Sequence, residues 1–296
     1  MVGEAQRDDA GSARPRAASA QPAEASPEGA DARLPAYAAA DGGPAPWDAA
    51  RDAPREAPLQ APAVAYRIDT LQLVAPRISE TPLMDMTETF NIHLRSALGE
   101  DVEPADGWLD LSLVLAFDDL SAETEGGQLD LVPANCTHPA ESTACGPTPG
   151  RLIAPSSYTE QSSGSCMDIV LDPAPSNPAD EVNVPSAPCF STAPATVTLS
   201  FAAMSLELDH AVLAARYGDQ SPPERLLEGV LVGFLPKSRS DAIMVDRRLR
   251  GSAFVPSPPQ PFSTLIAEDA LATGPEGEPG YYMYFNFEAG RVAYTP

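Results

Sequence analysis

Apolar and polar residues alternate along the first patterned segment of the chain, YRIDTLQLVAP. Tyr66 and Ile68, and then Leu71 and Leu73, are separated by single polar residues, apart from a one-residue slip at Asp69-Thr70. Alternation with a period of two is typical of a strand with one buried face, and a one-residue slip is typical of a β-bulge. The pattern predicts a strand with a bulge.

The longest alternation follows in GWLDLSLVLAFDDL and predicts a strand against the core. Its apolar side consists of Leu109, Leu111, Leu113, Leu115 and Phe117. Further strands are expected at Gln128 to Val132, Met167 to Leu171, Thr196 to Phe201, Ser205 to Ala214, Gly229 to Leu235 and Gly280 to Phe287.

Between these two segments the apolar spacing changes to three and four residues, which is the spacing of one helical face. The stripe consists of Leu83, Met86, Phe90, Leu94 and Leu98. A helix from Thr81 to Leu98 is predicted, with Glu88, Asn91 and Arg95 turned outward and Gly99 as the stop. KSRSDAIMV after Pro236 favours a second, short helix.

These elements predict a mostly β fold, either an antiparallel β-sandwich or an open barrel, with one packed amphipathic helix. The 33 prolines against 20 glycines agree with short strands and many turns. The ordered domain is expected over residues 63–296, with a cysteine-stapled loop region at 133–190. Residues 1–62 contain 20 alanines and nine prolines and are expected to form a disordered leader or linker.

The charge is strongly acidic, with 42 Asp and Glu against 18 Lys and Arg, a net charge of −24. Such a surface repels phosphate backbones and anionic lipid, which argues against nucleic-acid binding. Arginine carries nearly all the positive charge, and the arginines do not cluster in the sequence. No apolar run of 18 residues is present, so no transmembrane helix is expected.

Four cysteines fall within 54 residues, at Cys136, Cys145, Cys166 and Cys189. Pairing neighbours along the chain would close loops of 10 and 24 residues, each stabilising by roughly 2 to 4 kcal/mol. The two other pairings stay open, as does a zinc site that uses Cys136 and His138, although only one pair of ligands is closely spaced.

Disulfides indicate a periplasmic or extracellular location for a secreted bacterial protein. The first twenty residues are polar and lack the apolar core of a signal peptide, so an export signal is expected upstream of an alternative start.

An acidic turn, GEDVEPADG, separates the helix from the long strand. Asp101, Glu103 and Asp106 are candidate calcium ligands, with Asp110 as a further carboxylate, because calcium prefers oxygen-rich turns that contain glycine. A solvated acidic turn is the alternative. GPEGEPG at 274–280 repeats the pattern more weakly.

The histidines are His93, His138 and His210, and a hydrolase would need one of them as its base. No Gly-x-Ser-x-Gly, HExxH, CxxC or phosphate-binding loop is present. Asp209 and His210 are neighbours in an expected strand and so face opposite sides. The sequence therefore favours a protein that is not an enzyme.

The aromatic segment YYMYFNF near the C-terminus places Tyr281, Met283, Phe285 and Phe287 on one side of a strand. A central core strand and a stacking surface for a sugar or peptide are both compatible with it.

Several of these segments together resemble a group of exported proteins from GC-rich proteobacteria of the myxobacterial type, to which no activity is assigned. The segments are YRIDTLQLVAPRI, TETFNIHLRSAL, ADGWLDLSLVLAF, LEGVLVGFL and GYYMYFNFEA, and the likeness spans residues 66 to 296. Members of that group often carry fuller Asp/Gly-rich turns, so the resemblance implies calcium at EDVEPADG and GPEGEPG.

The sequence thus favours a non-enzymatic module of the cell envelope or extracellular space that binds a protein or glycan partner. A calcium-stabilised structural domain is the first alternative. A secreted hydrolase with His210 or His93 as base is the second.

Overall fold

A computed structural model describes residues 64–81, 84–102, 105–118, 120, 126–148, 154–167, 181–201, 204–220, 222–245 and 259–295. The chain divides into two units, Met1–Glu56 and Ala57–Pro296. All the described residues belong to the second unit. The proposed leader, residues 1–62, lies outside the described residues.

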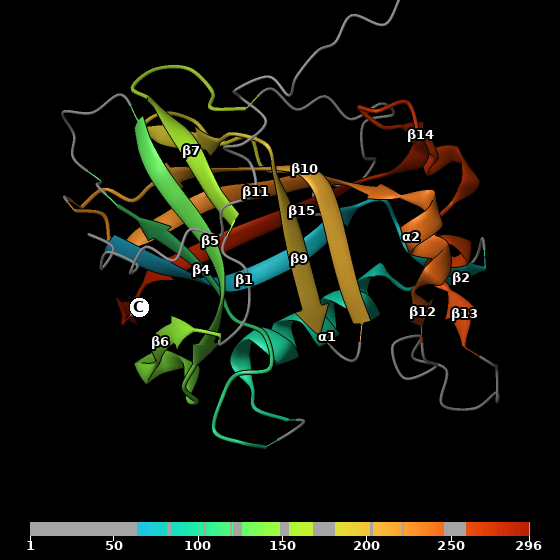
Figure 1. Cartoon of the computed structure of the whole chain (residues 1–296), viewed down its shortest axis with the longest axis horizontal. Helices are drawn as coiled ribbons and strands as arrows, with labels where there is room; N and C mark the ends of the chain where they lie inside the picture. Colours follow the sequence, from blue (N-terminus) through green and yellow to red (C-terminus); the bar gives the residue numbers. More distant parts are fainter. Residues whose placement is uncertain are drawn as a thin grey trace, which may run out of the picture. The chain divides into compact units, whose positions relative to one another are not determined.

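Eight antiparallel strands of the described chain pair in a closed circuit (Figure 1). Each strand in the order β1, β4, β5, β7, β8, β10, β11 and β15 pairs with the next, and β15 returns to β1. Their bounds are β1 Val64–Ala75, β4 Leu113–Phe117, β5 Gly126–Cys136, β7 Ala154–Gln161, β8 Cys189–Thr192, β10 Met204–Tyr217, β11 Arg225–Pro236 and β15 Pro279–Arg291. The prediction of a mostly β fold with one main helix is confirmed. Both predicted arrangements, the antiparallel β-sandwich and the open barrel, are compatible with this sheet.

Shorter elements extend the circuit and cover its ends. The β-strands are β2 Ser79–Thr81, β3 Met84–Asp85, β6 Ala144–Pro147, β9 Ala195–Phe201, β12 Met244–Val245, β13 Gln260–Pro261, β14 Ala272–Thr273 and β16 Ala293–Tyr294. The helices are α1 Thr87–Gly99, α2 Lys237–Ala242 and the 3-10 turns η2 Ala140–Ser142, η5 Phe262–Leu265 and η6 Glu268–Ala270. The short helix expected after Pro236 is α2.

The predicted bulge in the first strand is confirmed. The register of β1 against β15 shifts between Ile68 and Thr70, at the position where the alternation slips. The extra residue keeps Ile68 and Leu71 on the same buried side of the strand, since both belong to the main core.

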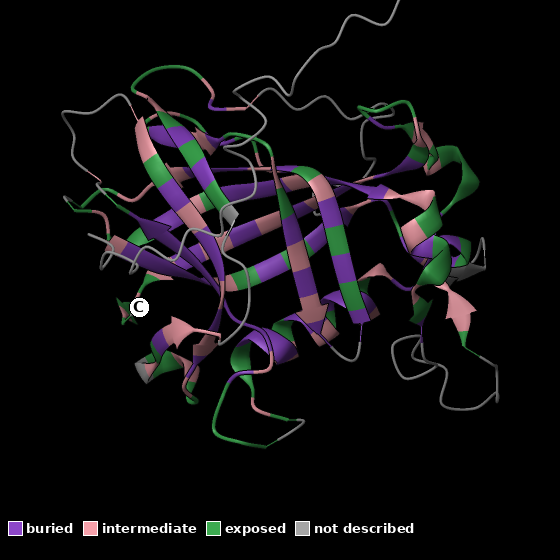
Figure 2. Ribbon diagram, in the orientation of Figure 1, coloured by how far each residue is buried: buried purple, intermediate pink, exposed green. Residues whose placement is uncertain are grey.

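Apolar side chains fill the interior of the circuit. Buried residues recur along the strands of the circuit in Figure 2. Tyr281, Met283, Phe285 and Phe287 point inward from β15 with at most 4% exposure. The aromatic segment is therefore a core strand, as one of its two interpretations predicted. A second group of rings packs edge to face near one end of the circuit and consists of Tyr66, Phe117, Tyr158 and Phe190.

The long alternating segment forms a shorter strand than predicted, β4. Its apolar side from Leu111 to Phe117 joins the main core as predicted. Leu109, which precedes the strand, packs instead in a separate cluster with Ala65 and Cys136. Both faces of β4 are covered, so all five of its residues are buried.

Helix α1 begins six residues later than predicted, at Thr87. The chain before it forms the short antiparallel pair β2–β3, and the Asp85 carboxylate accepts the Thr87 N–H at 2.8 Å. Phe90, Leu94 and Leu98 are buried as expected.

The prediction that Asn91 faces solvent is wrong, because this residue is only 2% exposed. The Asn91 amide oxygen accepts the Leu73 N–H at 2.8 Å, and the amide nitrogen donates to the Leu73 carbonyl at 3.0 Å. The side chain thus satisfies both backbone groups of Leu73, next to the second register shift of β1.

The segment that begins at residue 181 lies on the outer face of β11 and β15. The Asn183 N–H donates to the Asn286 side chain at 2.8 Å, and the Asn183 amide donates to the Gly229 carbonyl at 3.1 Å. Val182 is buried there against Val230. A separate cover, β6 with η2 and β16, lies on the outer side of Ala65 and Ala116.

Among the described residues, no helix is long and apolar enough to span a membrane.

Replacing Asn91 by alanine should lower the free energy of unfolding by about 2 to 4 kcal/mol, because two buried backbone groups of Leu73 lose their partners. Urea denaturation measures the change. Ile92→Ala, on the exposed side of the same helix turn, is the control and should change stability by under about 0.5 kcal/mol. A loss below about 1 kcal/mol for Asn91→Ala would contradict this role.

Candidate functional site

The acidic turn is closed by its own hydrogen bonds. The Asp101 carboxylate accepts the backbone N–H groups of Asp106 and Gly107 at 3.1 and 2.6 Å, and Asp106 accepts the Trp108 N–H at 3.1 Å. Glu103 lies outside the described residues. Among the residues that the structure describes, no three acidic, histidine or cysteine side chains form a metal-binding group. The carboxylates of Asp101 and Asp106 thus have a role in turn formation, and calcium binding stays a prediction.

The four cysteines form two disulfides, and of the three connectivities that the sequence left open the pairing of neighbours along the chain is the one present. Cys136 bonds to Cys145 with an S–S distance of 2.02 Å, and Cys166 bonds to Cys189 at 2.08 Å. The zinc site considered above would need the Cys136 sulfur as a ligand, but this sulfur is bonded to Cys145. Cys136 and Cys145 lie opposite each other in the β5–β6 pair.

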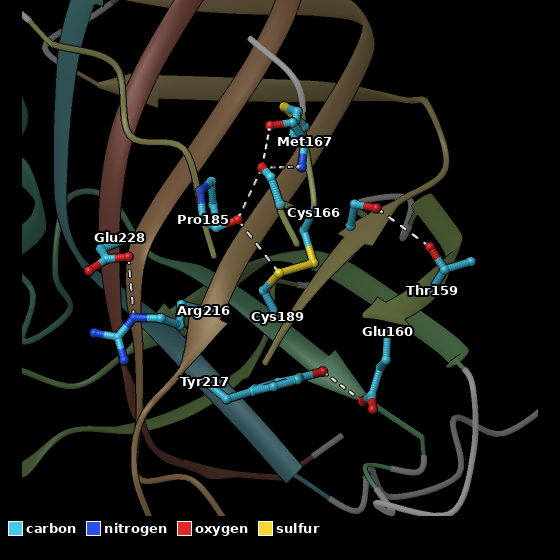
Figure 3. Close-up of a disulfide and its surroundings, with 11 residues drawn as sticks. Thr159, Glu160, Cys166, Met167, Pro185, Cys189, Arg216, Tyr217 and Glu228 are labelled. Carbon is cyan, nitrogen blue, oxygen red and sulfur yellow. Dashed lines mark hydrogen bonds and ion pairs between the residues drawn. A yellow bond between two sulfur atoms is a disulfide. The ribbon is translucent and has the colours of Figure 1, made fainter. Parts of the chain in front are cut away.

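Figure 3 shows the second disulfide beside the end of β10. The Tyr217 hydroxyl donates to the Glu160 carboxylate at 2.7 Å, which ties β10 to β7. Burial, and then the hydrogen bond to Glu160, raise the pKa of Tyr217 far above its usual value. Tyr217 is therefore held neutral as a hydrogen-bond donor, which is a structural role.

His210, one of the candidate bases, and its sequence neighbour Asp209 have different ion-pair partners. The Asp209 carboxylate binds Arg239 at 2.8 Å, while His210 faces Glu276 at 3.8 Å. His210 has a φ of 50° within an irregular stretch of β10. Asp209 and His210 thus contact different partners, Arg239 and Glu276.

A cavity of about 430 Å³ lies on the outer face of β1, β11 and β15, with η2 as its wall. This volume is within the range of small-ligand pockets, roughly 300 to 1,000 Å³. The lining is mostly charged. It comprises Arg67, Asp69, Ala140, Glu141, Thr143, Glu224, Arg225, Gly290, Arg291 and Val292. We call it the arginine pocket.

Arg67 forms the floor of the arginine pocket, and its side chain is 5% exposed. One guanidinium nitrogen donates to the Leu98 carbonyl at 2.8 Å, and the other contacts the Asp69 carboxylate at 3.0 Å. Leu98 lies in the last turn of α1, where carbonyl groups lack intrahelical partners and attract cations. Arg67 is therefore committed to the fold.

Two more guanidiniums line the arginine pocket and stay accessible. Arg225 is 48% exposed and contacts Glu288 at 3.0 Å and Asp69 at 3.7 Å. Arg291 is 37% exposed and contacts Glu224 at 3.3 Å. A guanidinium has five N–H donors, so each of these arginines retains donors that point to solvent or to a ligand.

Asp69 lies between Arg67 and Arg225 and is 29% exposed. Burial raises the pKa of Asp69 above its usual value, against the opposing attraction of the two arginines. Gly290 permits this position, because a Cβ at residue 290 would lie 2.6 Å from an Asp69 carboxylate oxygen.

The wall of the arginine pocket is a loop closed by the first disulfide. Cys136 and Cys145 flank the segment that carries Glu141 and Thr143. The Thr143 hydroxyl oxygen is buried, and no hydrogen-bond partner for it is present among the described residues. The disulfide therefore fixes one side of the cavity.

Sequence reasoning missed the arginine pocket because its residues come from four separate segments. Arg67, Arg225 and Arg291 are far apart in the chain and do not cluster there. The β1–β15 and β11–β15 pairings bring them together, with Arg67 opposite Gly290 and Arg225 opposite the same glycine. Arg67 occupies one of the polar positions of the alternation in β1, so the sequence carried no distinct signal for the arginine pocket.

No family model, curated protein or solved structure matches this chain.

The described lining of the arginine pocket consists of guanidiniums, carboxylates, one hydroxyl and a small apolar part. Guanidiniums bind carboxylates and other oxyanions through paired N–H donors.

Removing the first disulfide with Cys136→Ser/Cys145→Ser should lower the free energy of unfolding by about 2 to 4 kcal/mol and also loosen the pocket wall. The matched variant Cys166→Ser/Cys189→Ser should destabilise by a similar amount without loosening the wall. Amide hydrogen exchange at residues 140–144 measures this difference: protection should fall in Cys136→Ser/Cys145→Ser and stay unchanged in Cys166→Ser/Cys189→Ser. Equal protection of this loop in both variants would contradict the assignment.

The raised pKa of Asp69 predicts a specific pH dependence. An acid with a higher pKa in the folded protein binds its proton more tightly when folded, so protonation favours the folded state. The unfolding free energy of the wild type, minus that of Asp69→Asn, should be largest below the usual aspartate pKa of about 3.9 and fall as pH rises through the raised pKa. Urea titrations of both proteins from pH 3 to 7 test this, and a difference that grows with pH would contradict it.

Proposed function

We propose that this chain is a non-enzymatic binding module of the cell envelope or extracellular space, and that the arginine pocket is its ligand site. The observation that carries the proposal is the pair of accessible guanidiniums, Arg225 and Arg291, in a cavity of about 430 Å³. A ligand with an oxyanionic group fits these donors.

The rigid setting of the arginine pocket supports a binding role. Arg67, Asp69 and Arg225 form a linked network across β1 and β11, and the wall is closed by a disulfide. A ligand that enters a preorganised site loses little free energy to ordering the protein.

The overall charge supports a small ligand. The chain carries a net charge of −24, so a long polyanion such as a nucleic acid meets repulsion over the rest of the surface. A small molecule experiences mainly the local charges, because the Debye length in physiological salt is about 8 Å.

The proposed location is supported by the two disulfides, which persist in oxidising compartments. The alanine- and proline-rich composition of residues 1–62 supports a spacer that presents the domain.

Sulfate is a simple oxyanion probe for the arginine pocket. Titration of ¹⁵N-labelled protein with sodium sulfate, against sodium chloride at equal ionic strength, should shift the backbone amide signals of Gly290, Arg291 and Val292. Arg291→Gln should weaken sulfate binding about tenfold, the amount expected for one charge-assisted hydrogen bond of about 1.5 kcal/mol.

Arg95→Gln is the matched control, because Arg95 is also half exposed and also pairs with one glutamate, on helix α1. It should bind sulfate as the wild type does. The proposal fails if sulfate leaves the pocket amides unchanged, or if both variants weaken binding equally.

A further inference from the structure

The geometry points to a zwitterionic ligand, a free amino acid or a short peptide with both charged ends. Its carboxylate would lie at Arg291 and Arg225, and its ammonium group at Glu141 and Glu224. This inference rests on the proposed function of the arginine pocket and names the chemical class of its ligand.

The first argument is the balance of charge in the described lining. Three guanidiniums, those of Arg67, Arg225 and Arg291, face three carboxylates. The carboxylates are those of Asp69, Glu141 and Glu224. A purely anionic ligand is attracted by the arginines but repelled by the carboxylates, and a purely cationic ligand meets the reverse. A molecule that carries both charges gains from both sets.

The second argument is which of these groups are still available. Arg67 and Asp69 bind each other at 3.0 Å and are mostly buried, so they belong to the protein's own network. Glu141 is exposed, and no partner for its carboxylate is present among the described residues. Glu224 is 55% exposed and uses one oxygen for Arg291. The accessible part of the lining therefore consists of two cationic and two anionic side chains.

The third argument concerns uncharged ligands. The described lining contains no aromatic side chain, and its apolar part is limited to Ala140 and Val292. A neutral sugar would lack an aromatic face to stack on, and an apolar molecule would bury charged groups without partners. Charge recognition is what this lining offers.

The charged lining residues come from different structural elements. Glu141 lies on the η2 wall, whereas Arg225 and Arg291 lie on β11 and β15. Glu224 precedes β11 and pairs with Arg291, so it lies on the same side as the arginines. Glu141 is therefore the anionic group that comes from a different element than the two arginines, as the ammonium end of an extended small zwitterion requires. The buried Thr143 hydroxyl beside Glu141 is a further hydrogen-bonding group on the same wall.

Alanylalanine and its two capped forms test the inference directly. N-acetyl-alanylalanine lacks the ammonium group, and alanylalanine amide lacks the carboxylate. Isothermal titration calorimetry at low salt should show alanylalanine binding at least tenfold more tightly than either capped form.

Two variants test which side chain binds the ammonium end of the ligand and which binds its carboxylate end. Glu141→Gln should abolish the preference for the free amine, so that alanylalanine and its N-acetyl form bind alike. Arg291→Gln should abolish the preference for the free carboxylate over the amide. Glu88→Gln, an exposed glutamate on α1, is the control and should keep both preferences. Unchanged amide spectra would show that the variants remain folded.

The outcomes separate this inference from the proposed function. If sulfate binds at the arginine pocket while alanylalanine does not, or while its capped forms bind equally well, the zwitterion inference is overturned and the binding function stands. A preference for the free amine that survives in Glu141→Gln also overturns the inference. If neither sulfate nor alanylalanine binds, both proposals are overturned.

Discussion

The burial of Asp69 between Arg67 and Arg225 is the constraint on which this end of the molecule depends. A desolvated carboxylate is costly unless it is paired. Here Arg67 comes from the same strand, β1, and Arg225 comes from β11, on the other side of β15. Arg67 also holds the last turn of helix α1 through Leu98, so the same network links the helix to the sheet. Gly290 leaves the space that Asp69 occupies. One ion network therefore fixes the helix, three strands and the floor of the arginine pocket.

The rest of the outer face of β1, β11 and β15 is covered in two different ways. The segment around Asn183 lies over β11 and β15 through side-chain bonds to Asn286 and Gly229, with the Cys166–Cys189 disulfide beside it. The β5–β6 hairpin, closed by Cys136–Cys145, covers β4 and the start of β1. The arginine pocket lies beside this hairpin. Both disulfides thus stabilise covers of the outer face, while the interior is stabilised by apolar packing.

Features that depend on local spacing could be predicted from the sequence. The alternation around Asp69 revealed the bulge in β1. The number and spacing of the cysteines indicated two disulfides but left their connectivity open. Asn91 could not be placed, because its burial depends on an unpaired stretch of β1 that exists only in the folded sheet. Strands β7 and β8, which close the circuit, carry serine, threonine and glutamate in place of a clear alternation and were missed. The arginine pocket could not be predicted either, because strand pairing brings its residues together from separate segments of the chain.

The central claim is that Arg225 and Arg291 are the ligand-binding groups, whereas Arg67 belongs to the protein's own network. Direct observation of the three guanidinium groups tests it, through the Nε–H signals of arginine in ¹⁵N-labelled protein during a titration with alanylalanine. The account predicts that the signals of Arg225 and Arg291 shift with the same dissociation constant while that of Arg67 stays in place. It is contradicted if saturating alanylalanine moves none of the three signals, or moves that of Arg67 alone.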